Sequence, residues 1–235
     1  MDYAGIEDVF VQIGGQFYTS AYKMQTRLKD IKAYVFDWDG VFNSARKGAD
    51  QLSDYSEVDS MGIKMLRFAH FLMHKNMAYV AIFDEKEGSQ GKGFAKRDSF
   101  DEAYTNLKDK RKALSHFCEK HNISPHNVVY VYDDVMDVSV AAESAVRLAV
   151  GREDSPVFRE FLKTHKLADY RSGSTGGKHA VREHCELLLM LLNKHHEVIE
   201  RMSTCDPACL DFEEQLEQKT TEIYSYDGQK FSLGI

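Results

Sequence analysis

Two aspartates separated by a single residue, Asp37 and Asp39, end an apolar run and are followed by Gly40. Side chains of an extended chain point to the same side at every second residue, so both carboxylates leave the strand end together. Like charges held side by side raise a pKa or require a cation. Mg²⁺ suits them, because it binds one or two carboxylates together with water and phosphate oxygens. The pair therefore indicates phosphoryl transfer, although Asp-x-Asp alone is more often two solvated acids.

A second acidic group follows another apolar run further along the chain. Asp133 and Asp134 end that run, and Asp137 comes one helical turn later. We expect Asp133 to bind the same ion, while Asp134 and Asp137 orient the ion or its waters from behind. Lys110 lies near the start of the helix expected before this run. A lysine there can neutralise an attacking carboxylate and a phosphoryl oxygen together.

The elements that must position these residues alternate between strands and helices. Apolar runs predict strands at 31–38, 77–83, 127–132 and 145–150. Helical spacing of apolar residues predicts helices at 60–75 (begun by Asp59 or Ser60), 109–122, 135–144, 154–165 and 178–199. This repetition favours a doubly wound, Rossmann-like parallel sheet of the α/β class. Such sheets bind ligands at the carboxyl ends of their strands, where both acidic groups and Asp84 stand.

Both ends of the chain fall outside this pattern. We expect an N-terminal extension at 1–30, the main domain at 31–200 and a C-terminal tail at 201–235. In the tail, an acidic stretch at about 208–220 has a helical pattern. Asp227-Gly228 between two aromatic runs predicts a hairpin.

The composition excludes several classes of protein. Of 235 residues, 43% are hydrophobic, which is enough to build a core and excludes a disordered chain. Thirty basic against 37 acidic residues give a net charge of −7, so we expect no binding to nucleic acid. No apolar run is long enough to cross a membrane, and the first residues do not resemble a signal peptide. Four cysteines are too few for a dense disulfide framework, so we expect a reduced, cytoplasmic protein. We also expect no contact with a membrane.

The ordered motifs carry a resemblance to a known family. Val-Phe-Asp37-Trp-Asp39-Gly-Val, Lys110 and Tyr-Val-Tyr-Asp133-Asp134-Val-Met-Asp137 resemble the haloacid dehalogenase superfamily. The nearer likeness is to its capless sugar phosphatases, the 3-deoxy-D-manno-octulosonate 8-phosphate phosphatase family. Gly176-Gly-Lys-His-Ala-Val-Arg-Glu183 is similar to the Gly-Gly-x-Gly-Ala-Val-Arg-Glu segment of that family. The likeness covers about residues 31–196.

The resemblance implies a magnesium-dependent phosphomonoester hydrolase acting on a small phosphorylated metabolite, with sugar phosphates as candidates. Asp37 would be the nucleophile that forms an aspartyl-phosphate, Asp39 the general acid and then the base, and Lys110 would stabilise charge. Asp37, the backbone carbonyl of Asp39 and Asp133 would hold Mg²⁺. The family also implies a homo-oligomer, a tetramer, in which a neighbouring subunit helps to close the site. Residues 41–59 are too few for a folded cap.

Several positions depart from the family pattern. Asp84 stands where the family has a Thr or Ser that donates a hydrogen bond to the phosphoryl group, and Glu85-Lys86 replaces Gly-Arg. A carboxylate about 4 Å from a phosphoryl oxygen costs several kcal/mol, which is a loss of roughly a hundredfold or more in rate. Val58 replaces an Arg of the substrate site, which argues against the same sugar acid. Tyr132 replaces a Gly before Asp133, where we expect it to crowd the site.

These departures leave alternatives open. Asp84 and Gly40 are the residues that we expect to face the substrate. A second hypothesis is a catalytically impaired member of the fold that binds metal or acts as a structural protein. A third is a phosphotransferase or phosphonate-type enzyme that uses the same aspartate. A Gly-rich segment, 88–93, is expected to be a solvated loop rather than a phosphate-binding one.

Overall fold

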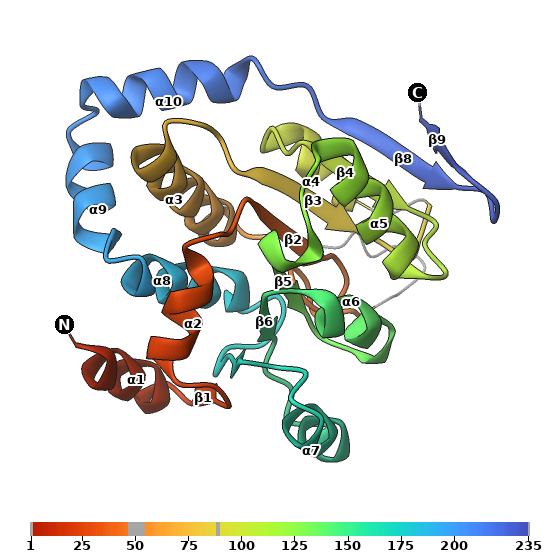
Figure 1. The fold of residues 1–235 in the computed structure, drawn as a ribbon, viewed down its shortest axis with the longest axis horizontal. Coiled ribbons are helices and arrows are strands. Elements are labelled where there is room, and N and C mark those ends of the chain that lie inside the picture. The colour runs from red at the N-terminus through yellow and green to blue at the C-terminus, as the bar shows by residue number, and fades with distance from the viewer. Residues whose placement is uncertain (1, 47–54, 88–89, 235) are drawn as a thin grey trace.

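A mixed sheet forms the centre of the computed structural model, which describes residues 2–46, 55–87 and 90–234. Nine strands of these residues belong to it, in the order β1-β7-β6-β5-β2-β3-β4-β8-β9 (Figure 1). They are β1 (Gln16–Phe17), β2 (Ala33–Asp37), β3 (Tyr79–Phe83), β4 (Glu102–Thr105), β5 (Val128–Tyr132), β6 (Val146–Ala149), β7 (Tyr170–Arg171), β8 (Glu222–Tyr226) and β9 (Phe231–Leu233). All neighbours pair in parallel except β1 with β7 and β8 with β9.

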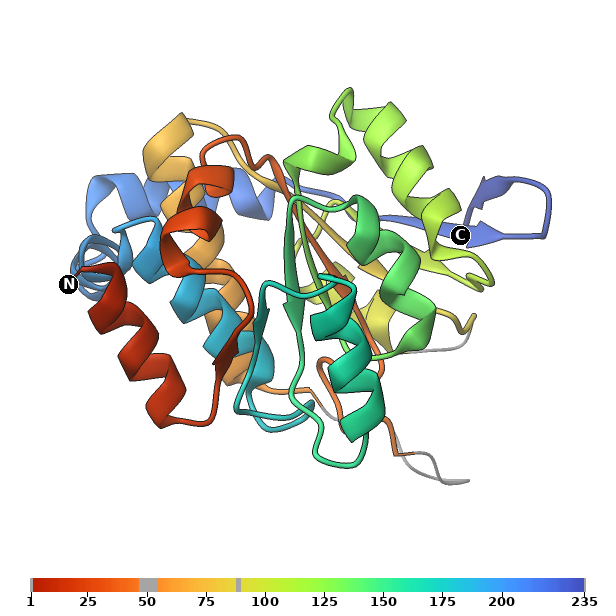
Figure 2. The same cartoon turned by 60° about the horizontal axis from the view of Figure 1, so that its bottom comes forward.

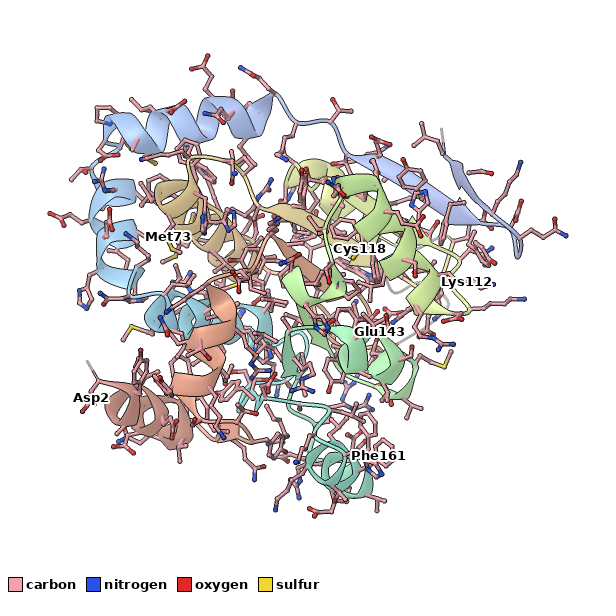
Figure 3. All side chains as sticks on the ribbon, in the orientation of Figure 1. Asp2, Met73, Lys112, Cys118, Glu143 and Phe161 are labelled. Atoms are coloured by element: carbon pink, nitrogen blue, oxygen red, sulfur yellow. The ribbon has the colours of Figure 1, made fainter. Side chains whose placement is uncertain are left out.

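Two layers of helices cover the sheet (Figure 2). The described helices are α1 (Tyr3–Gln12), α2 (Ala21–Leu28), α3 (Glu57–His74), α4 (Gly91–Arg97), α5 (Lys110–His121), α6 (Val138–Glu143), α7 (Pro156–Thr164), α8 (Ala180–Leu191), α9 (His195–Ser203) and α10 (Pro207–Glu217), with 3-10 turns η1 (Pro125–Asn127) and η2 (Val135–Asp137). Residues of α1, α2, α3, α4 and α8 pack into one core, and those of α5, α6 and α7 into another. Figure 3 shows Met73 on α3 and Lys112 on α5 to either side of the central strands. The predicted doubly wound α/β fold is confirmed.

The order in which strands are added to the sheet reverses at β2, and this reversal determines where the site lies. From β2 it continues to β3 on one side, and it returns later as β5 on the other. Ligands bind outside the carboxyl ends of parallel strands at such a switch point. All five residues of β2 are buried, so the strand is held rigidly between its neighbours.

The predicted strands are confirmed, but two helix boundaries were wrong. The helix predicted to begin at Asp59 or Ser60 begins with Glu57, because the hydroxyl of Ser56 accepts a hydrogen bond from the amide of Val58 (3.0 Å) and caps it. The helix predicted at 178–199 is two helices, α8 and α9. Asn193 between them has a left-handed backbone (φ 53°), which ends the first helix.

The stretch 84–108 contains two elements that no pattern indicated, α4 and β4. The expectation of a loop over the Gly-rich segment 88–93 was wrong for its last three residues. Residues from Gly91 onward belong to α4, while 88 and 89 lie outside the described residues. The span 41–59, expected to be too short for a cap, likewise includes undescribed residues, 47–54.

The two ends of the chain extend the sheet at both edges. β1 adds to β7, and β8 adds in parallel to β4. Strands β8 and β9 form an antiparallel hairpin around Gly228 (φ 102°), and the Tyr224 ring stacks on that of Tyr104 (5.2 Å between centroids). The tail thus packs on its own subunit. Among the described residues, no helix has the length and hydropathy that crossing a membrane requires.

Candidate active site

Three acidic side chains meet at the carboxyl edge of the sheet. Asp37 ends β2, Asp133 follows β5 and Asp137 ends η2. One carboxylate oxygen from each lies within 4.8 Å of the other two, and all three side chains are buried. Hard carboxylate oxygens at this spacing match the ligands that Mg²⁺ prefers. The residues present therefore fit the metal that the family resemblance implies.

The electrostatics of this acidic cluster show why it needs a cation. Burial raises the pKa of Asp37 well above its ordinary value, and the charges of Asp137 and Asp133 raise it further against the opposing effect of Lys110. Burial, followed by the charge of Asp137, raises the pKa of Asp133 to about 7. Without a cation, the carboxyl groups hold a proton or repel one another.

Lys110 supplies one positive charge inside the cluster. It is the first residue of α5, whose N-terminus Asp109 caps by accepting from the amide of Arg111 (3.1 Å). The Nζ atom of Lys110 donates to Asp37 Oδ1 at 2.7 Å and to Asp137 Oδ1 at 2.6 Å. Burial lowers the pKa of this ammonium, but the two carboxylates raise it by more. Lys110 therefore stays charged next to Asp37.

Asp137 is held by donors from three directions. Its Oδ1 accepts from Lys110 and from the hydroxyl of Tyr130 (2.5 Å), and its Oδ2 accepts from the amide of Asp134 (3.3 Å). Asp134 caps η2 through the amide of Val135 (2.8 Å), while its side chain remains half-exposed. Asp137 thus orients Lys110, and Asp134 orients the turn that carries Asp137.

Arg152 is a residue of the site that sequence reasoning missed. Its Nη1 donates to Asp133 Oδ2 at 2.9 Å and to Asp134 Oδ2 at 3.0 Å, and its Nε donates to Asp154 Oδ1 at 3.2 Å. The one available signal was position, because Arg152 follows β6 at the same edge of the sheet. Its guanidinium fixes the orientation of the Asp133 carboxylate.

A cavity of about 210 Å³ opens above the acidic cluster. It is lined by Asp37, Asp39, Ala45, Asp84, Glu85, Lys86, Asp133, Asp134, Asp137 and Arg152. Asp39 is partly exposed there, with Oδ1 accepting from Asn43 (3.3 Å) and Oδ2 lying 3.7 Å from Lys86 Nζ. Asp84 is 2% exposed and accepts from the amide of Lys86 (2.9 Å). Both carboxylates therefore face a space that a small substrate can enter.

The expectation that Tyr132 would crowd the site was wrong. Its hydroxyl donates to the backbone oxygen of Leu167 (2.7 Å), and its ring stacks on Tyr130 (5.6 Å between centroids, 5° between planes). Tyr132 belongs to the core that contains α5, α6 and α7. Because neighbouring residues at a strand end point to opposite faces, the tyrosine turns away when Asp133 faces the cavity.

Gly40 makes room for the Asp133 carboxylate. Its backbone is left-handed (φ 83°), and a Cβ atom there would lie 1.9 Å from Asp133 Oδ2. We expect Gly40→Ala to lower the free energy of unfolding by about 1–3 kcal/mol and to weaken Mg²⁺ binding. Urea unfolding and calorimetric titration with Mg²⁺ measure the two effects. Gly93→Ala is the matched control, since a Cβ at Gly93 meets nothing within 4 Å; equal losses in both variants would contradict this account.

Known proteins resemble this chain in sequence and in fold. The curated 3-deoxy-D-manno-octulosonate 8-phosphate phosphatase KdsC of Salmonella typhi is 26% identical over 182 residues, which cover 74% of this chain and 87% of the relative. A solved putative phosphatase of the same name from Vibrio cholerae is 27% identical, with a TM-score of 0.59 over 73% of this chain and 90% of that one.

A third likeness shows the fold alone. The Moraxella catarrhalis phosphatase of that name, solved with magnesium, phosphate and KDO, is 23% identical, with a TM-score of 0.62 over 77% of this chain and 98% of that one. No family model matches. In sequence and architecture, the chain is therefore similar to phosphoric monoester hydrolases of the haloacid dehalogenase superfamily.

Proposed function

We propose that this protein is a magnesium-dependent phosphatase that hydrolyses a small phosphorylated metabolite through an aspartyl-phosphate on Asp37. The observation that carries the proposal is the contact of Lys110 Nζ with Asp37 (2.7 Å) inside a buried cluster of three carboxylates. A structural protein would gain nothing from such a cluster, because buried like charges cost stability.

The side chains divide the reaction into two displacements. A carboxylate oxygen of Asp37 attacks phosphorus, the bond to the leaving oxygen breaks, and that oxygen takes a proton from Asp39. A water molecule then attacks the phosphorus, gives its proton to Asp39, and the bond to Asp37 breaks to release phosphate. Asp39 suits both proton transfers because it lines the cavity and remains partly exposed. Lys110 neutralises charge on Asp37 throughout.

The cation belongs next to the nucleophile. Asp37, Asp133 and the backbone carbonyl of Asp39 would hold Mg²⁺, with Asp134 and Asp137 orienting these groups. When bound, the ion neutralises the carboxylates and the phosphoryl oxygens that approach them.

The substrate that we propose is a sugar phosphate or similar metabolite rather than the sugar acid named for the relatives. Val58, where the family has an Arg, lies exposed on α3 and offers no donor to a carboxylate. We further propose a cytoplasmic homo-oligomer, a tetramer by resemblance, in which a neighbouring copy covers the open edge. Light scattering of the purified protein tests the tetramer.

Release of phosphate from an aryl phosphate and from a panel of sugar phosphates, with and without Mg²⁺, tests the proposal. Asp84 and Glu85 in the cavity favour one alternative, a member of the fold that binds metal without turnover. Mg²⁺ would then raise the melting temperature while no ester in the panel is hydrolysed. Turnover that requires Mg²⁺ excludes that alternative.

Binding of the cation should depend on pH through Asp133. Because the pKa of this carboxyl group is raised to about 7, a proton must leave it before a cation binds. The affinity for Mg²⁺ is then maximal above this pH, and it falls by up to about tenfold for each pH unit below it. Calorimetric titrations at about pH 8 and about pH 6 measure the difference. Equal affinities at both pH values would show that Asp133 is not a ligand.

A further inference from the structure

Lys110 has a third acidic neighbour beyond the two that its proposed role requires. Glu85 Oε1 lies 3.4 Å from Lys110 Nζ, in addition to the hydrogen bonds with Asp37 and Asp137. An ammonium group has three donors and no acceptor. Two donors are used by Asp37 and Asp137, and the Glu85 carboxylate lies at ion-pair distance on the remaining side of the ammonium group.

Burial shows which of these neighbours lies between Lys110 and the cavity. The side chain of Lys110 is 1% exposed, those of Asp37 and Asp137 are 7% and 1% exposed, and that of Glu85 is 44% exposed. Glu85 is among the described residues that line the cavity, and Lys110 is not. A phosphoryl oxygen that enters from the cavity therefore meets the Glu85 carboxylate before it can reach Lys110.

We propose that the Glu85 carboxylate occupies the position at Lys110 that a phosphoryl oxygen takes in the reaction, so that every substrate must displace it. Glu85 is thereby a specificity-determining residue. The inference rests on the proposed function, because it requires a reaction in which Lys110 contacts a phosphoryl oxygen of the substrate.

Displacement selects the class of substrate. Inorganic phosphate and minimal phosphate esters gain little from the rest of the cavity, so breaking the contact between Glu85 and Lys110 removes much of their affinity. A phosphomonoester with a larger organic part makes further contacts with the cavity, and the binding energy of these contacts offsets the cost of displacing Glu85. Glu85 is half-exposed on a chain segment outside the sheet, so its carboxylate can move into water.

Phosphate binding by the Mg²⁺-loaded full chain tests this inference, with inorganic phosphate as the calorimetric probe. Glu85→Gln keeps the length of the side chain and removes its charge, so phosphate affinity should rise by about tenfold or more. Glu85→Asp keeps the charge but shortens the reach to Lys110, and should recover part of the gain. Glu87→Gln, the same charge change at an exposed residue outside the cavity lining, should leave affinity unchanged.

Steady-state kinetics add a second readout. KM for an aryl phosphate should fall in Glu85→Gln in proportion to the gain in phosphate affinity. The inference is overturned if Glu85→Gln binds phosphate no tighter than wild type, or if Glu87→Gln gains as much. If Glu85→Gln binds phosphate more tightly but neither it nor wild type hydrolyses any ester, the inference stands and the proposed function fails.

Discussion

Asp37→Asn is expected to abolish phosphate release, with kcat reduced on the order of 10⁴-fold or more. An amide cannot attack phosphorus to form an acyl phosphate, so the covalent route is lost rather than slowed. The substitution keeps the size of a buried side chain that lines the cavity and accepts from Lys110 at 2.7 Å. Phosphate release from an aryl phosphate at saturating Mg²⁺ measures the loss.

Asp8→Asn is the matched control, because Asp8 is exposed on α1 far along the chain from the site. It should retain wild-type activity, and both variants should unfold cooperatively. Asp37→Asn with more than about a tenth of the wild-type rate would show that Asp37 is not the nucleophile.

Asp84→Ser is expected to raise kcat/KM by about a hundredfold or more, with roughly a thousandfold as the upper limit that about 4 kcal/mol allows. The Asp84 carboxylate is 2% exposed and lines the cavity, so water screens its charge poorly. A phosphoryl group brings negative charge to that cavity, and a full charge at about 4 Å costs about 4 kcal/mol at an effective dielectric near 20. Serine removes the charge, offers a donor to the phosphoryl group and keeps an acceptor for the amide of Lys86.

Asp84→Ala separates the two contributions, because it removes the charge and supplies no donor. We expect it to gain less than Asp84→Ser and still to exceed wild type, with initial rates compared at several substrate concentrations. A loss of activity in both variants would mean that Asp84 serves the reaction, for example by binding a positively charged part of the substrate.

Much of the fold was predictable from the sequence, because apolar runs typical of strands alternate with apolar residues at helical spacing. β2 and β5 are unbroken apolar runs that end in aspartates, so their order and the edge of the sheet that they share placed Asp37 and Asp133 together. Lys110 was predictable in the same way, since a helix had to start near it. These residues depend on regular elements, whose geometry a local pattern determines.

The remaining features depend on loops and on single backbone conformations. The contacts of Arg152 with Asp133 and of Glu85 with Lys110 join segments that no periodic pattern relates. β4 has only four residues within a polar stretch, so its apolar signal was too short to recognise. The break between α8 and α9 depends on the left-handed backbone conformation of Asn193. A single asparagine within a helical pattern of apolar residues does not by itself predict the end of a helix.

The central claim is that the buried carboxylates hold a divalent cation beside the nucleophile Asp37. A crystal structure of the wild-type protein with Mn²⁺ and orthovanadate, with the metal located by its anomalous signal, tests this claim most directly. The account predicts a metal peak at about 2.0–2.3 Å from oxygens of Asp37 and Asp133, with vanadium bonded to Asp37. An anomalous map without a peak between these two carboxylates, or with Mn²⁺ bound elsewhere, would contradict it.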